Sequence, residues 1–153
     1  MVQGMRIAIG SDMPAHVVDL VIEEVRRRGH EVVVVGAPKE GREVPWPRVA
    51  LEVAEMVRSG ECDEGIVMCW TGTGVTIVAN KVPGIRAALC VDAETAKGAR
   101  KWNHANVLAM SIRLTSEYVA KEILEAWFTT PFDEKEKPMI NMVEEVENKY
   151  MKQ

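Results

Sequence analysis

A cysteine, two threonines and two glycines lie together in residues 69–74, Cys-Trp-Thr-Gly-Thr-Gly, between an apolar stretch and an amphipathic one. This pattern predicts a turn from a strand into a helix. The free amides at a helix start attract negative charge, and glycine lets the backbone approach a ligand closely. A cysteine at such a turn is expected to have more thiolate character than a core cysteine. A base beside an oxyanion cradle is suited to moving a proton next to a carbonyl group.

The same turn also has a structural interpretation. Cys69 could be an inert packing residue, as unpaired cysteines often are, although its place at a strand end favours a functional thiol. The glycine-rich turn alone is a weak signal, and it is not the nucleotide P-loop, which closes with Gly-Lys-Ser/Thr. Cys62 and Cys90 lack such a setting, so packing suffices to explain them.

Asp12 follows the first apolar stretch, and Pro14 comes two residues later. Aspartate is favoured as a helix N-cap, and proline suits the first helical turn. A carboxylate at a strand end can also contact a substrate hydroxyl. Asp12 is therefore a candidate for either role or for both.

Short apolar stretches alternate with amphipathic ones along the chain. Strands are predicted at residues 6–10, 31–35, 65–68, 87–90 and 107–110. Helices are predicted at residues 15–28, 47–59, 75–81, 93–102 and 116–128. This alternation is typical of a parallel sheet covered on both faces, and ligands of such sheets bind beyond the carboxyl ends of the strands. The predicted fold class is α/β, a Rossmann-like three-layer α/β/α sandwich with a five-stranded parallel sheet and a C-terminal helix.

The end of the chain departs from this rhythm. Residues 131–138 are polar and bounded by prolines, and residues 139–152 are predicted to form a helix with Met142, Val143 and Val146 on one side. This helix could pack on its own domain or on a partner subunit. Because there is no internal repeat or linker, residues 1–153 are predicted to form one domain.

The composition argues against several classes of protein. Of the 153 residues, 47% are hydrophobic and 27% are charged, as in soluble globular proteins. A net charge of −4 argues against a nucleic-acid partner, and no apolar run is long enough to cross a membrane. Three scattered cysteines give no disulfide framework and no metal-ligand spacing. We therefore expect a cytoplasmic protein with neither a metal nor a cofactor.

Residues 69–90, CWTGTGVTIVANKVPGIRAALC, closely resemble the B-type ribose-5-phosphate isomerases and the related galactose-6-phosphate isomerase subunits. Residues 10–12, Gly-Ser-Asp, and residues 103–108, Asn-His-Ala-Asn-Val-Leu, resemble them too, and the match runs from about residue 5 to residue 132. The resemblance implies a homodimer or a dimer of dimers, with active sites at the subunit interface. It also implies aldose–ketose isomerisation of a small sugar or sugar phosphate through a cis-enediolate.

The resemblance assigns a role to each matching residue. Cys69 is the base that moves a proton between C1 and C2, and Asp12 binds or polarises sugar hydroxyls. Asn103 orients substrate oxygens, and Arg113 is an anion contact. The oxyanion cradle consists of Thr71, Gly72, Thr73 and Gly74.

The chain departs from the family pattern at several positions. Met13 stands where members have histidine, Trp102 replaces the histidine that opens the furanose ring, and Trp70 replaces a glycine. The residues that align with the basic phosphate clamp are Glu136, Lys137 and Ile140. Three indoles offer flat faces for the apolar side of a sugar, those of Trp46, Trp70 and Trp102.

These features predict an isomerase whose substrate is not ordinary ribose 5-phosphate. An open-chain substrate, such as a tetrose phosphate or a sugar without phosphate, suits the absence of the ring-opening histidine. The alternative is a non-catalytic paralogue that binds a sugar or a sugar phosphate. A nucleotide-binding module is a weaker interpretation, because the P-loop lysine is missing.

Overall fold

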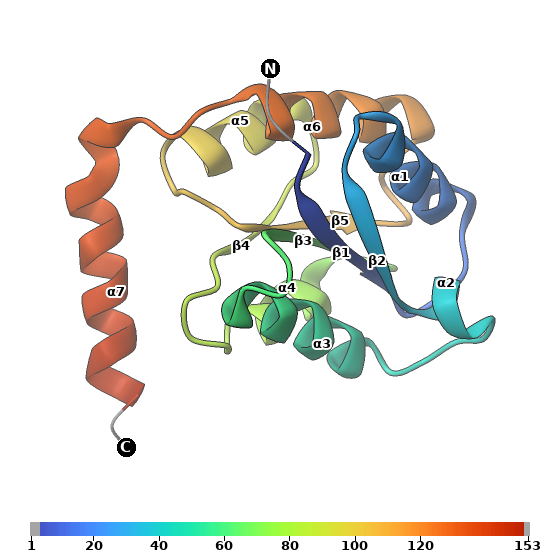
Figure 1. Ribbon diagram of the computed structural model, residues 1–153, viewed down its shortest axis with the longest axis horizontal. Coiled ribbons are helices and arrows are strands. Elements are labelled where there is room, and N and C mark those ends of the chain that lie inside the picture. The colour runs from blue at the N-terminus through green and yellow to red at the C-terminus, as the bar shows by residue number, and fades with distance from the viewer. Residues whose placement is uncertain (1–3, 152–153) are drawn as a thin grey trace.

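A five-stranded parallel sheet lies at the centre of the protein, with helices on both of its faces (Figure 1). The structure is a computed structural model that describes residues 4–151. The strands are β1 (Arg6–Ser11), β2 (Glu31–Gly36), β3 (Glu64–Cys69), β4 (Ala87–Leu89) and β5 (Val107–Ser111). The helices are α1 (His16–Arg27), α2 (Ala37–Glu40), α3 (Trp46–Ser59), α4 (Thr73–Ala79), α5 (Ala93–Lys101), α6 (Glu117–Thr129), the 3-10 helix η1 (Glu134–Glu136) and α7 (Lys137–Met151). The predicted α/β/α sandwich is confirmed.

The strands follow the order β2-β1-β3-β5-β4 across the sheet, and every neighbouring pair is parallel. Helices α1, α5 and α6 cover one face, and α3 and α4 cover the other (Figure 1). This order makes β3 the central strand. Its carboxyl end therefore lies between the carboxyl ends of β1 and β5.

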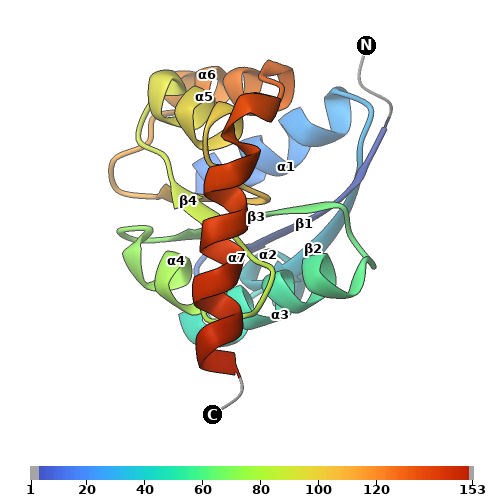
Figure 2. The same ribbon diagram turned by 90° about the vertical axis from the view of Figure 1, so that its left-hand side faces the viewer.

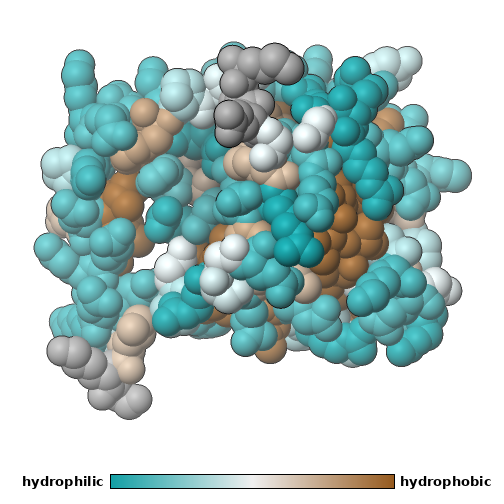
Figure 3. Space-filling model, viewed as in Figure 1, coloured by the Kyte–Doolittle hydropathy of each residue, from teal (hydrophilic) through white to brown (hydrophobic). Residues whose placement is uncertain are grey.

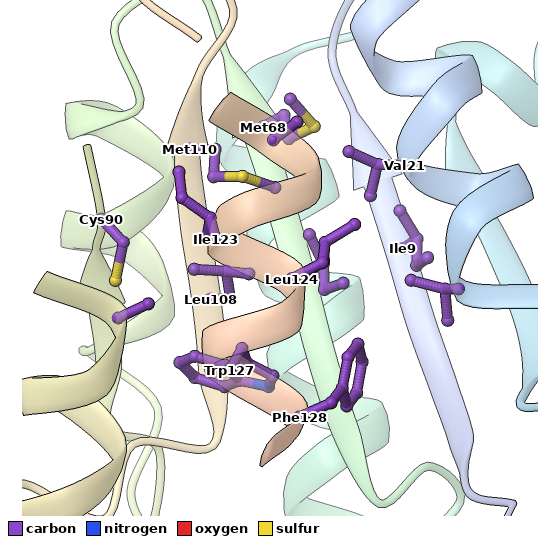
Figure 4. Close-up of a cluster of buried hydrophobic side chains, with 14 of the residues drawn as sticks. Ile9, Val21, Met68, Cys90, Leu108, Met110, Ile123, Leu124, Trp127 and Phe128 are labelled. Carbon is purple, nitrogen blue, oxygen red and sulfur yellow. The ribbon is translucent and has the colours of Figure 1, made fainter. Parts of the chain in front are cut away.

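The larger of the two cores lies between the sheet and α1, α5 and α6. In Figure 4, side chains of the sheet such as Ile9 and Leu108 meet Leu124 and Trp127 of α6, and all of them are sealed from solvent. Strand β3 is buried along its whole length because helices cover both of its sides. Burial of this kind fixes the positions of the strand ends where the predicted site residues lie.

A buried ion pair fixes the opposite, amino edge of the sheet. Glu64, at the start of β3, pairs with Arg100 of α5 at 2.7 Å and accepts a hydrogen bond from Nε1 of Trp127 at 2.9 Å. The guanidinium also lies 4.5 Å from the centre of the Trp127 ring. These contacts hold the end of α5 and the end of α6 against the central strand.

Several element boundaries differ from the prediction. Helix α4 begins at Thr73, two residues early, and ends at Ala79, because the Asn80 side chain exchanges two hydrogen bonds with the backbone of Ala87. Strand β4 ends at Leu89, since Asp92 caps α5 by accepting from the Thr95 amide. The short helices α2 and η1 were not predicted. A helix of one turn leaves no periodic signal in a sequence.

Helix α7 stands apart from the other helices in Figure 1 and crosses in front of the β4 edge of the sheet in Figure 2. It touches its own chain through Ile140, which is buried, and through Glu147, whose carboxylate accepts from the Gly84 amide at 2.9 Å. A groove of about 1010 Å³ separates α7 from the sheet, and apolar side chains line the inner side of the helix (Figure 3). The predicted C-terminal helix is confirmed, apart from residue 152, which lies outside the described residues.

Replacing Arg100 with methionine should lower the free energy of unfolding by about 3 kcal/mol, because it leaves the Glu64 carboxylate buried without its charge partner. Urea denaturation measures this change. Lys97→Ala is the control, since Lys97 makes an exposed pair with Glu94 on the same helix and should change stability by less than about 1 kcal/mol. Equal effects of the two substitutions would contradict a stabilising role for the buried pair.

Candidate functional site

Cys69 is the last residue of the central strand, and its side chain is 6% exposed. The strand register places Met68 beside Ser11 of β1 and Cys69 beside Ser111 of β5. The segments that follow these three strands therefore surround the thiol. Of the sequence-predicted residues, Asp12, Cys69, residues 71–74 and Arg113 belong to these segments.

Gly72 shapes the turn between Cys69 and α4. Its φ is 77°, in the left-handed region, and a Cβ there would lie 2.6 Å from Cδ1 of Leu89 and 3.0 Å from the carbonyl carbon of Met110. A residue with a side chain would therefore clash with the end of β5 and strain the backbone. Glycine at this position brings the turn down onto the sheet edge.

The oxyanion cradle follows at the start of α4. No side chain in residues 4–151 caps this helix, so its first amides keep their capacity to bind an anion. The hydroxyls of Thr71 and Thr73 lie 2.7 Å apart, and both residues are exposed. The cradle thus offers backbone amides and two hydroxyls directly after Cys69.

Two of the three predicted indoles accompany this turn. The ring of Trp46, at the start of α3, packs so closely on Gly74 that a Cβ there would lie 2.9 Å from it. Trp70 follows Cys69 and is 54% exposed. Both rings retain surface that a ligand can contact.

Asp12 lies directly after β1, and one of its carboxylate oxygens, Oδ1, is buried without a hydrogen-bond partner among the described residues. Burial raises the pKa of Asp12, and the nearby charge of Glu43 raises it further. The N-cap of α1 is Ala15 rather than Asp12. The cap interpretation is therefore wrong, and this oxygen keeps an unused capacity to accept a hydrogen bond.

Arg113 belongs to the turn after β5, which is bonded to the cysteine turn. The amide of Ile112 donates to the Cys69 carbonyl at 2.9 Å, and the amide of Arg113 donates to the Trp70 carbonyl at 3.0 Å. The Arg113 side chain is exposed. A cation is thereby placed two residues beyond the end of β5.

Trp102 and Asn103 lie at the other edge of the sheet. They follow α5 and precede β5, whose four residue steps span roughly 13 Å before the carboxyl edge is reached. Trp102 packs against Gly98, and both Trp102 and Asn103 line the groove beside α7. Trp102 and Asn103 therefore do not lie beside the Cys69 of their own chain.

His104 adopts a left-handed backbone conformation, with φ of 52°. Its ring stacks on Phe132, with the ring centres 4.2 Å apart. Burial lowers the pKa of His104, and the cations Arg86 and Arg100 lower it further. The imidazole is therefore neutral near pH 7, and it faces the segment that leads to α7.

The other two cysteines are buried. Burial raises the pKa of Cys90 to about 12 and also raises the pKa of Cys62. Within residues 4–151, no group of three or more histidine, cysteine or acidic residues is arranged to hold a metal ion. In the same part of the chain, no helix has the length and apolar character needed to span a membrane.

Two buried serines at strand ends hold these turns, a role that the sequence did not predict. Ser11 Oγ donates to the Met13 carbonyl at 2.7 Å, and Ser111 Oγ donates to the Trp70 carbonyl at 2.9 Å. Both serines end apolar strands, and that position was the available signal. A polar residue that closes a buried strand has to find a partner in the adjoining loop.

Comparison with known proteins identifies the family. The model of the Ribose/Galactose Isomerase family matches residues 7–144. The chain is 39% identical to D-erythrulose-4-phosphate isomerase of Pectobacterium atrosepticum over 132 residues, and this aligned region covers 84% of this chain and 86% of that protein. It is 36% identical to ribose-5-phosphate isomerase B of Escherichia coli over 129 residues, and this aligned region covers 84% of this chain and 86% of that protein.

A solved structure agrees with this relationship. Ribose-5-phosphate isomerase B of Clostridium thermocellum superposes with a TM-score of 0.90 at 39% identity, covering 95% of this chain and 99% of that one. The family expected from residues 10–12, 69–90 and 103–108 is thereby confirmed. The chain belongs to the ribose/galactose isomerase family and is an intramolecular oxidoreductase of the sugar-phosphate isomerase type.

Proposed function

We propose that this protein interconverts an aldose phosphate and a ketose phosphate through a cis-enediolate, with Cys69 as the base. The observation that carries the proposal is the position of the Cys69 thiol. It ends the central strand directly before a turn with exposed hydroxyls and free helix amides. A base and an oxyanion site are thus joined within six residues.

The proposed reaction moves one proton between neighbouring carbons. The Cys69 thiolate takes the proton from the carbon beside the carbonyl, and the electron pair of that bond forms the enediolate double bond. The negative charge on the former carbonyl oxygen is held by Thr71 and by the amides of Gly72–Gly74. Asp12 takes the proton from the hydroxyl of the neighbouring carbon and gives it to the former carbonyl oxygen. Cys69 then returns its proton to the former carbonyl carbon, which completes the isomerisation. A base and hydrogen-bond donors suffice for this step.

We propose a four-carbon sugar phosphate as the substrate. The Cys69 side chain is only 6% exposed, and the indoles of Trp46 and Trp70 border its turn, which favours a short open chain over a ring as the group that reaches the thiol. Trp102 cannot protonate a ring oxygen, because an indole N–H is not an acid at neutral pH. The similarity to a D-erythrulose-4-phosphate isomerase supports the same choice. Arg113 is the proposed phosphate contact.

We propose that the complete site forms between two copies of the chain, in a homodimer or a dimer of dimers. Asn103 and Trp102 lie at the edge of the sheet opposite to Cys69, so a second copy is needed to bring them to the thiol. Helix α7 leaves Val143, Val146 and Tyr150 exposed beside a groove, which is surface that a second copy can cover. The three unpaired cysteines support a cytoplasmic location.

A panel of tetrose, pentose and hexose phosphates and free sugars tests the proposed reaction. We expect turnover of a tetrose phosphate, and Cys69→Ala should lower kcat by roughly 10²–10⁴-fold, the usual contribution of a positioned base. Cys90→Ala is the matched control, because it removes a buried thiol that has no part in the reaction. An NMR assay of substrate and product measures the rates.

Two outcomes of this panel would contradict the proposal. Turnover that survives in Cys69→Ala would remove Cys69 as the base. A sugar phosphate that raises the melting temperature without being converted would favour the non-catalytic binding paralogue instead.

Mixing two inactive variants tests the shared site. Cys69→Ala and Asn103→Ala each damage every site of their own homodimer, but a mixed dimer of a symmetric protein keeps one intact site. After unfolding and refolding together in equal amounts, the mixture should reach roughly a quarter of the wild-type rate. If each site were built within one chain, the mixture would show only the mean of the two residual activities.

The raised pKa of Asp12 predicts a pH-dependent gain in stability on Asp12→Asn. Because the pKa is higher in the folded state, folding disfavours the charged form, and wild-type stability falls as the pH rises through the folded-state pKa. Asp12→Asn should therefore be more stable than wild type at pH 7, and the difference should vanish below about pH 4. Urea denaturation between pH 3 and pH 8 measures it.

Glu43→Gln is the companion to this measurement, since the Glu43 charge contributes to the shift. In a protein that already carries Glu43→Gln, the gain in stability from Asp12→Asn at pH 7 should be smaller. If wild type were more stable than Asp12→Asn at pH 7, burial of the Asp12 carboxylate would not be unfavourable and the prediction would be wrong.

A further inference from the structure

Ser111 ends β5 directly beside Cys69, and its hydroxyl is sealed inside the protein. The residue is 1% exposed, and the register of β3 and β5 pairs it with Cys69. A buried hydroxyl is unfavourable unless it is hydrogen-bonded. Its partners therefore indicate which parts of the protein it holds in place.

Two hydrogen bonds connect this hydroxyl to two different turns. Ser111 Oγ donates to the carbonyl oxygen of Trp70 at 2.9 Å and accepts from the amide of Leu114 at 3.2 Å. The first bond holds the peptide between Trp70 and Thr71, one residue beyond the proposed base. The second holds the turn that carries Arg113. One side chain thus links the proton-transfer end of the proposed site to its phosphate end.

Two backbone bonds also connect these turns. Beyond the strand pairing of β3 with β5, which stops at Cys69 and Ser111, the amide of Ile112 donates to the Cys69 carbonyl at 2.9 Å and the amide of Arg113 donates to the Trp70 carbonyl at 3.0 Å. The Ser111 hydroxyl gives this carbonyl a second donor. Alanine or glycine at position 111 would remove that donor and would also leave the Leu114 amide without its acceptor.

We propose that Ser111 is a positioning residue of the isomerase, whose hydroxyl fixes the placement of Cys69 and Thr71 relative to Arg113. The inference rests on the proposed function, because it concerns the same site. Ser111 acts through the residues that meet the substrate and makes no contact with the substrate itself. Its two bonds run to backbone groups in the turn after Cys69 and in the turn that carries Arg113.

The kinetic test compares Ser111→Ala with Ser116→Ala in the full chain, on the substrate that the sugar-phosphate panel identifies. Ser116 accepts from the Val119 amide at 3.2 Å at the start of α6, so the control also loses a bond between a serine and the backbone. Ser111→Ala should lower kcat by about 10–100-fold and raise KM, as a shift of reacting groups by about 1 Å does. Ser116→Ala should change neither constant.

Melting temperatures separate positioning from stability. Both variants should melt at a somewhat lower temperature than wild type, because each loses a hydrogen bond. Only Ser111→Ala should lose activity at a temperature where both are folded. Ser111→Gly serves as a second variant if Ser111→Ala does not fold, and the same loss of kcat is expected of it.

Alkylation of Cys69 by iodoacetamide tests the inference without turnover. Cys69 retains a small exposed area, whereas Cys62 and Cys90 are sealed, and peptide mass spectrometry identifies the modified residue. Because a turn with fewer bonds opens more often, Cys69 should react at least about threefold faster in Ser111→Ala than in wild type. Ser116→Ala should match wild type.

The outcomes distinguish this inference from the proposed function. If wild type isomerises a sugar phosphate and Ser111→Ala has the kcat and KM of Ser116→Ala, the positioning role is wrong and the proposed function stands. If wild type converts none of the sugars, the proposed function fails and alkylation alone decides. Faster alkylation of Cys69 in Ser111→Ala than in wild type then supports the proposal that Ser111 holds the turn after Cys69. An unchanged rate overturns that proposal.

Discussion

The register in which β3 pairs with β1 and β5 determines what chemistry this protein can perform. It places Cys69 beside Ser111 and one residue beyond the partner of Ser11, so that three loops meet around one thiol. A shift of one residue would turn the Cys69 side chain to the other face of the sheet. Burial of the central strand on both sides holds this register, and the tight fit of Gly72 against Met110 sets the path of the chain beyond it.

The alternation of apolar and amphipathic segments was sufficient to predict the sheet, its parallel direction and the loops at its carboxyl edge. The strand-to-helix turn at Cys69 was predictable for the same reason, since cysteine, threonine and glycine fill it in an order with chemical meaning. Asp12 was ambiguous because a cap and a ligand contact use the same residue type at the same place. The position of Ser111 at a strand end was predictable, but its role was not, because its bonds run to segments that only the folded chain brings near.

The separation of the predicted residues between two edges of the sheet was also implicit in the sequence. Asn103 precedes a strand, whereas Cys69 ends one and Asp12 follows one, and parallel strands place such positions at opposite edges. His104 was harder to place, because its left-handed backbone turns the ring toward Phe132. Asn106 of the same motif supports the backbone, since its side chain bonds Gly84 and Arg86. A shared motif thus combines residues of different function.

Exchange of the transferred proton with solvent shows most directly whether Cys69 is the base. When the protein converts its sugar phosphate in deuterated water, a cysteine base that exchanges with solvent should place deuterium at C1 or C2, which proton NMR detects as loss of the signal at that carbon. Wild type should incorporate deuterium, and Cys69→Ala should incorporate none above background. Equal incorporation by both proteins would contradict the central claim that the Cys69 sulfur removes the proton.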